Sequence, residues 1–129
     1  MSDAVLDTSA LLALLLDEPG ADTVQATLPG ALMSAVNLAE VVSKLCERGM
    51  PADQVAFAVS SIGVEIVAFD DEQARVSGAL RPLTRAWGLS LGDRACLALA
   101  RLRNLPALTA DIAWANVPDC RVTLIRNGP

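Results

Sequence analysis

The sequence predicts an α/β fold, in which a central, mostly parallel sheet of about five strands is flanked by helices. Short apolar runs, which are typical of buried strands, alternate along the chain with longer segments of helical periodicity. The chain has 129 residues, of which 53% are hydrophobic, and this is enough to bury the core of one compact domain. We therefore expect residues 1–129 to form a single domain.

The strands and helices can be assigned in chain order from these patterns. The expected strands are Ala4 to Asp7, Ala31 to Ser34, Val64 to Phe69, Ala107 to Thr109 and Val122 to Ile125. The expected helices cover residues 9–17, 21–28, 36–48, 52–61, 71–87 and 91–103. Glycine and proline residues separate these segments as turns or helix stops, at 20, 29–30, 49–51, 63 and 88.

The cysteine content and the hydropathy of the chain predict the cellular compartment of the protein. The cysteines, Cys46, Cys96 and Cys120, are odd in number and have no CxxC spacing, so we interpret them as small core residues. Free thiols favour a reducing environment. The longest apolar run, residues 10–16, is far shorter than the roughly 20 residues that span a bilayer, and the acidic N-terminus is unlike a signal peptide. We expect a soluble, unprocessed cytoplasmic protein with no membrane partner.

The charged and polar composition excludes several kinds of chemistry. The sequence contains no His and no Tyr, which removes the usual general base, the Ser-His-Asp and Cys-His arrangements, and zinc sites that use His. The formal net charge of -5 argues against binding nucleic acid through a broad basic surface. Catalysis would therefore depend on carboxylates.

Four acids lie beside apolar segments rather than on evident surface faces, and they are Asp7, Glu40, Asp93 and Asp111. Two of them follow predicted strands. Asp7 could cap the helix that comes next, and Asp111 could cap the turn that follows it.

The other two acids also have structural explanations. Glu40 is three residues after Asn37, and Asp93 is three residues after Ser90, which in both cases resembles a helix-capping box. Glu40 could instead form a surface ion pair with Lys44 on the same helix face.

The combined placement of the acids favours a shared site. Ligands of an open parallel sheet bind at the carboxyl ends of its strands. Asp7 and Asp111 follow such ends, and Glu40 comes shortly after another. Asp93 follows a connection between two helices, but it begins an apolar stripe, and an acid in that position points inward more often than outward.

Carboxylates that converge without a basic partner repel one another, and burial adds to the cost of their charge. A divalent cation would remove this conflict. Oxygen-only ligands suit Mg²⁺ or Mn²⁺, and such an ion also lowers the pKa of a bound water, so that hydroxide is available at neutral pH. A site of this kind would need no His as a general base.

Four segments of the sequence resemble the PIN domain, and in particular the VapC-type toxins of bacterial toxin–antitoxin pairs. The segments are VLDTSALLALLLDEPG at 5–20, SAVNLAEVVSKL at 34–45, LSLGDRACLALAR at 89–101, and LPALTAD with the following IAW at 105–114. They occur in the order and spacing of the family, and they cover nearly the whole chain.

This resemblance implies a PIN-like nuclease domain with Mg²⁺- or Mn²⁺-dependent endoribonuclease activity, which acts as a toxin and inhibits translation. The family's acidic catalytic and metal-binding site corresponds to Asp7, Glu40, Asp93 and Asp111, with Glu40 binding the ion directly or through water.

The resemblance also implies supporting polar residues. A hydroxyl residue just after the first acid often assists in the family, which here would be Thr8 or Ser9. A further polar residue commonly follows the fourth acid, and Asn116 and Asp119 are both candidates.

The implied partners are an RNA substrate, a second copy of the chain in a homodimer, and a cognate antitoxin protein that covers the acidic pocket. Two other functions remain open. One is a PIN-like binding module whose acids cap helices or hold a structural ion, and the other is a housekeeping PIN nuclease without an antitoxin.

Overall fold

The computed structural model describes residues 2–127, and it confirms the predicted α/β class. Five strands form one sheet in the order β3-β2-β1-β4-β5, and every neighbouring pair is parallel. The strands are β1 Val5–Leu6, β2 Leu32–Ser34, β3 Glu65–Val67, β4 Ala107–Thr109 and β5 Val122–Leu124. The helices are α1 Thr8–Leu15, α2 Ala21–Gln25, α3 Ala35–Glu47, α4 Ala52–Ser61, α5 Asp71–Thr84 and α6 Leu91–Arg103, with 3-10 turns η1 Arg85–Trp87 and η2 Ile112–Asn116.

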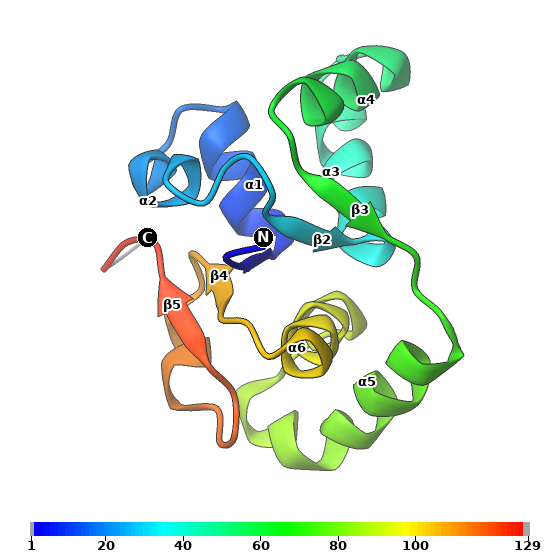
Figure 1. The fold of residues 1–129 in the computed structure, drawn as a ribbon, viewed down its shortest axis with the longest axis vertical. Helices are drawn as coiled ribbons and strands as arrows, with labels where there is room; N and C mark the ends of the chain where they lie inside the picture. The colour runs from blue at the N-terminus through cyan, green and yellow to red at the C-terminus, as the bar shows by residue number, and fades with distance from the viewer. Residues whose placement is uncertain (1, 128–129) are drawn as a thin grey trace.

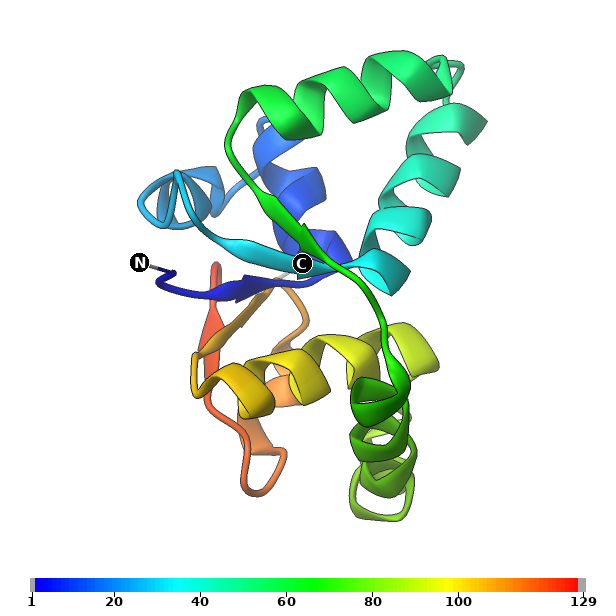
Figure 2. The same ribbon diagram turned by 45° about the vertical axis from the view of Figure 1, so that its right-hand side comes forward.

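Helices cover both faces of the sheet. Figures 1 and 2 show α1 to α4 on one side and α5 and α6 on the other. Successive side chains of a strand point to opposite faces of the sheet, so each strand contributes to a hydrophobic core on either face. In β1, Leu6 packs with the first group of helices, while its neighbour Val5 packs with α6. Trp114, which is fully buried, fills the second core. The sheet is thus the middle of three layers.

The main differences from the predicted boundaries lie at helix ends. The helix expected at 71–87 ends at Thr84 and continues as the 3-10 turn η1. Pro82 lies in its last turn and has no backbone N–H to donate, and Gly88 ends the segment in the left-handed conformation. The second helix is also shorter than expected, since it ends at Gln25.

The interpretation of the cysteines as core residues holds only in part. Cys96 is buried and Cys120 is half-buried, but Cys46 is exposed, so placing it in the core was wrong. It follows the buried Leu45 on α3 and lies on the outer face of that helix. All three are free thiols. No helix within residues 2–127 is both long and apolar enough to cross a bilayer.

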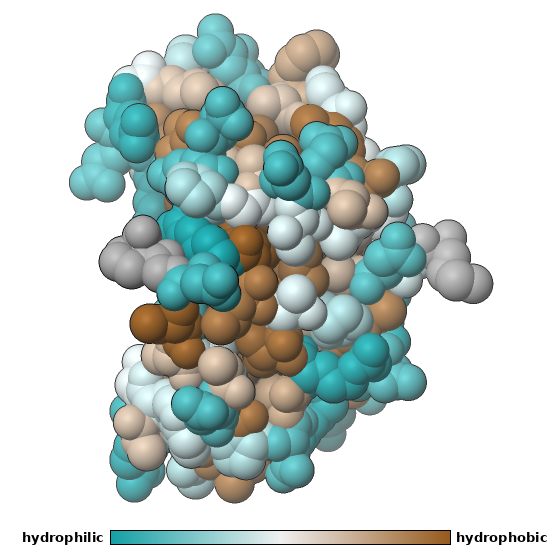
Figure 3. All heavy atoms as spheres, turned by 90° about the vertical axis from the view of Figure 1, so that its left-hand side faces the viewer, coloured by the Kyte–Doolittle hydropathy of each residue, from teal (hydrophilic) through white to brown (hydrophobic). Residues whose placement is uncertain are grey.

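Some apolar surface is left uncovered. Phe57 on α4 is 73% exposed. A hollow of about 250 Å³ between α3, α4 and β3 is lined almost entirely by apolar side chains, among them Leu38, Val42 and Ile66. On another face, the side of α2 and β5, apolar side chains gather in a band between polar ones (Figure 3). The molecule therefore has more than one apolar surface that a second protein could cover.

Substitutions at Gly20 and Gly49 can be compared to test the close packing at the start of α2. Gly20 has a φ of 99°, and a Cβ there would lie 2.7 Å from the carbonyl oxygen of Ile125. Gly49 has a similar φ of 97° but nothing within 4 Å of that position. Both Gly→Ala substitutions strain the backbone, but only the first adds a collision. We expect Gly20→Ala to reduce the free energy of unfolding by about 1–3 kcal/mol more than Gly49→Ala in urea titrations. Equal losses would contradict the close approach.

Candidate active site

Buried polar side chains gather where three neighbouring strands end. Thr109 is the last residue of β4 and Ser34 the last of β2, while Asp7 and Thr8 directly follow β1. All are buried, as is Asn37 in the first turn of α3. Because the strands are parallel, their carboxyl ends meet at one edge of the sheet. This edge is the candidate site.

Asp7 is held by hydrogen bonds on both carboxylate oxygens. Its Oδ1 accepts from the backbone N of Ala10 at 2.8 Å and from Ser9 Oγ at 2.7 Å, and its Oδ2 accepts from Thr109 Oγ1 at 2.6 Å. The first of these contacts makes Asp7 the N-cap of α1, as predicted. The Asp7 side chain is therefore fixed to its own helix and to β4.

The environment of Asp7 disfavours its charge. Burial raises the pKa of Asp7 from 3.8 to about 6, although the hydrogen bonds from Thr109, Ala10 and Ser9 act in the opposite direction. The negative charge of Asp93 raises the pKa slightly further. At neutral pH Asp7 is ionised, at a cost in stability.

Glu40 is joined to α1 rather than to Lys44. Thr8 Oγ1 donates to Glu40 Oε1 at 2.5 Å, and Asn37 Nδ2 donates to the same oxygen at 3.1 Å. The proposed Glu40–Lys44 surface pair was therefore wrong, and it is not among the ion pairs of residues 2–127. The capping box proposed for Asn37 was also wrong, because the helix begins earlier and Ser34 is its N-cap.

Asp93 and Ser90 form the predicted capping box at the start of α6. The backbone N of Ser90 donates to Asp93 Oδ2 at 2.9 Å, and the backbone N of Asp93 donates to Ser90 Oγ at 3.2 Å. Burial raises the pKa of Asp93, and the hydrogen bonds with Ser90 lower it. The charges of Asp111 and Glu40 also raise the pKa of Asp93, so both carboxylates act on it.

Asp111 caps the 3-10 turn η2, since its Oδ1 accepts from the backbone N of Ala113 at 3.0 Å. Asp111 is exposed, in contrast to Asp7.

The thiol of Cys96 is fully buried in α6, the helix that also carries Asp93. Burial raises the pKa of Cys96 well above its ordinary value, and the charges of Asp7, Asp93 and Glu40 raise it further.

The donor set suits a hard divalent cation. The four acids and the neighbouring hydroxyls offer only oxygen atoms as ligands, and burial raises the pKa of Asp7, so that a cation beside it would favour its charged form. Within residues 2–127, no three acidic or cysteine side chains form a ready-made group of metal ligands. Mg²⁺ does not require such a group, because it commonly binds through one or two carboxylates and keeps several waters. The residues therefore fit Mg²⁺ or Mn²⁺ in their chemistry.

The hydroxyl residues show what the sequence pattern predicted and what it missed. Thr8 contacts Glu40, and Ser9 contacts Asp7, so each hydroxyl holds a different acid. Thr109 was missed because it resembles an ordinary β-branched strand residue. The available signal was its position at the end of an apolar strand, two residues before Asp111.

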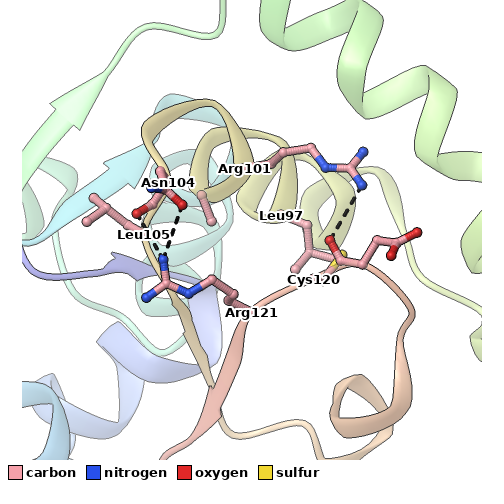
Figure 4. A pocket seen from close by; sticks show the side chains of 8 residues that line it. Leu97, Arg101, Asn104, Leu105, Cys120 and Arg121 are labelled. Carbon is pink, nitrogen blue, oxygen red and sulfur yellow. Dashed lines mark hydrogen bonds between the residues drawn. The ribbon is translucent and has the colours of Figure 1, made fainter.

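The two candidates for a further polar ligand lie elsewhere. Asn116 is exposed at the end of η2. A hollow of about 120 Å³ lies at the C-terminal end of α6, beside Arg101 and Asn104 (Figure 4). Asp119 lines this hollow, whereas Asp93 is in the first turn of that helix. Arg101 and Arg121 border this hollow, and they donate to the backbone carbonyls of Asp119 and Asn104 respectively.

Comparison with known proteins identifies similar sequences and folds. A sequence model of the PIN domain matches residues 4–119. The VapC ribonuclease Mb2780c of Mycobacterium bovis is 33% identical over 114 residues, which cover 81% of this chain and 87% of that protein. A chain in a toxin–antitoxin complex from Klebsiella pneumoniae superposes with a TM-score of 0.78 at 24% identity, covering 97% of this chain and 99% of the other. DNA-bound VapBC from Salmonella typhimurium gives a TM-score of 0.75 at 17% identity, with 98% and 100% covered.

The buried charge of Asp7 predicts a pH dependence of stability. Because the folded pKa of about 6 exceeds the ordinary 3.8, the folded state holds the proton more tightly, and rising pH destabilises it between about pH 4 and 6. Asp7→Asn lacks this titration. In EDTA, we expect the unfolding free energy of the wild type, relative to that of Asp7→Asn, to fall by about 2 kcal/mol from pH 4 to 7 in urea titrations. A difference that does not change with pH would contradict the raised pKa.

Proposed function

The chain belongs to the PIN domain family, as a VapC-type member, and we propose that it is a Mg²⁺- or Mn²⁺-dependent endoribonuclease that acts as a toxin and inhibits translation. One observation carries the proposal. Four acids from separate segments of the chain lie around one edge of the sheet. Asp7 and Asp111 follow β1 and β4, and hydrogen bonds through Thr8 and Asn37 connect Glu40 to the first turn of α6, where Asp93 lies.

The proposed metal ligands are Asp7, Asp93 and Asp111, with Glu40 binding directly or through water. A bound divalent ion would offset the repulsion between these acids and an RNA phosphate, and it would lower the pKa of a water near the scissile bond. The protein's own residues orient the carboxylates. Thr109 and Ser9 fix Asp7, and Thr8 fixes Glu40, so that these acids are pre-positioned before substrate arrives.

The proposed substrate is RNA with accessible single-stranded segments, since protein side chains reach the base edges of loops more readily than those of RNA helices. The net charge of -5 supports a site that depends on bound cations rather than on a broad basic surface. Arg101 and Arg121 are exposed, but they lie at the opposite end of α6 from the acids.

We propose two protein partners, a second copy of the chain and a cognate antitoxin that covers the acidic site. The structural neighbours titled as toxin–antitoxin complexes support the antitoxin as the second of these partners. The uncovered apolar surfaces are compatible with it, particularly the hollow between α3, α4 and β3 and the exposed Phe57. The free thiols are compatible with the proposed cytoplasmic location.

Replacing single acids tests the catalytic assignment. We expect Asp7→Asn and Asp93→Asn each to reduce Mn²⁺-dependent cleavage of total RNA by about a hundredfold or more, because an amide cannot replace the charge of a carboxylate. The fold should persist, since Asn also caps helices. Asp119→Asn is the matched control, because Asp119 lies away from the site and its left-handed φ of 60° suits Asn. Undiminished cleavage by either site variant would contradict the assignment.

A binding module whose acids only cap helices is the second candidate, because Asp7, Asp93 and Asp111 all take part in N-terminal capping. Metal binding separates the two functions. We expect Mn²⁺ to raise the melting temperature of the wild type in a concentration-dependent way, and to raise that of Asp7→Asn much less. An unchanged melting temperature, together with no RNA cleavage on metal addition, would favour the binding module.

A further inference from the structure

Asn37 is a buried amide that connects three helices at the site. Its Nδ2 lies 3.1 Å from Glu40 Oε1, 3.0 Å from the carbonyl oxygen of Gly92, and 3.4 Å from Thr8 Oγ1. These acceptors belong to α3, α6 and α1 respectively. Asn37 is 1% exposed, so these contacts are shielded from water. One amide therefore links the Glu40 carboxylate to the first turn of α6.

The other end of the same amide has no partner. Within the part of the chain that the structure describes, Asn37 Oδ1 is buried and accepts no hydrogen bond. An unpaired buried carbonyl costs stability. An apolar residue would avoid this cost but would lose the donor that faces Glu40. The Asn37 amide is therefore better explained by its contacts with the Glu40 carboxylate and the Gly92 carbonyl than by its contribution to folding.

Gly92 supplies the space that the Glu40 carboxylate occupies. A Cβ at residue 92 would lie 2.5 Å from both Oε1 and Oε2 of Glu40, closer than real Cβ contacts. Gly92 is buried in the first turn of α6, where glycine is otherwise unfavourable, and its backbone is not in the left-handed region. A Cβ at residue 92 would therefore displace the Glu40 carboxylate, which is the movable end of its side chain, rather than strain the backbone.

We propose that Asn37 and Gly92 are positioning residues that together set the place of Glu40 relative to Asp93. Asn37 donates to the carboxylate and to the backbone just before Asp93, and Gly92 leaves the carboxylate room to approach α6. For its effect on activity, this inference rests on the function proposed above.

The first test compares two Gly→Ala substitutions in helices. Gly78 in α5 has open space where a Cβ would be added, so Gly78→Ala is the matched control for Gly92→Ala. We expect Gly92→Ala to reduce kcat/KM for RNA by about tenfold to a hundredfold and to raise the Mn²⁺ concentration needed for half-maximal activity. Gly78→Ala should change neither. Equal values for the two variants would overturn the proposal.

Asn37→Ala is expected to raise the same Mn²⁺ midpoint by about tenfold, because Glu40 loses a donor while every carboxylate remains. A residue that only supports folding would lower the melting temperature without moving that midpoint in the folded fraction. An unchanged midpoint would therefore overturn the assignment of Asn37.

A double-mutant cycle tests the coupling without any activity measurement. Gly92→Ala should lower the urea midpoint in the wild-type background but not in Glu40→Ala, where the methyl group meets no carboxylate and the helix gains from the loss of a glycine. The same loss in both backgrounds would show that Gly92 acts independently of Glu40 and would overturn the proposal. If the wild type cleaves no RNA, the proposed function fails, but this cycle still decides whether Gly92 and Glu40 are coupled.

Discussion

Keeping Asp7 charged inside the protein is the constraint on which the rest of the site depends. A buried carboxylate needs donors, and Thr109, Ser9 and the first turn of α1 provide them. The two hydroxyls extend the network, because Ser9 Oγ accepts from the backbone N of Ala110 and Thr109 Oγ1 accepts from that of Asp111. The same contacts that stabilise one acid therefore fix the loop that carries another.

Helix capping and the proposed catalysis use the same carboxylates. Asp7, Asp93 and Asp111 each accept a hydrogen bond from a backbone N–H at the start of a helix or turn. The partial positive charge of a helix N-terminus stabilises a nearby carboxylate, which offsets part of the repulsion among the acids. Helix capping and metal binding are alternative explanations of these acids at the level of sequence. In the structure, the two roles are compatible in one arrangement of the same carboxylates.

The elements of the fold could be predicted because buried strands and amphipathic helices have distinct periods, and α4 and α6 match their expected bounds. Residues that act through tertiary contacts could not be predicted from these periods. Lys44 has the right spacing to pair with Glu40, but the fold places Thr8 beside that carboxylate instead. Thr109 and Gly92 carry no local signal, because their roles depend on side chains from distant segments. The acids were accessible to sequence reasoning because charge beside apolar runs is unusual.

The use of aspartates as helix caps has a genetic consequence. An Asp codon becomes an Asn codon by a single G-to-A transition, and Asn forms the same cap while it carries no charge. One base change at the codon for Asp7 or Asp111, which are both N-caps, therefore removes a carboxylate and preserves the start of a helix or turn. If the proposed toxin function holds, selection against toxicity has a short route to alleles that still encode a folded protein.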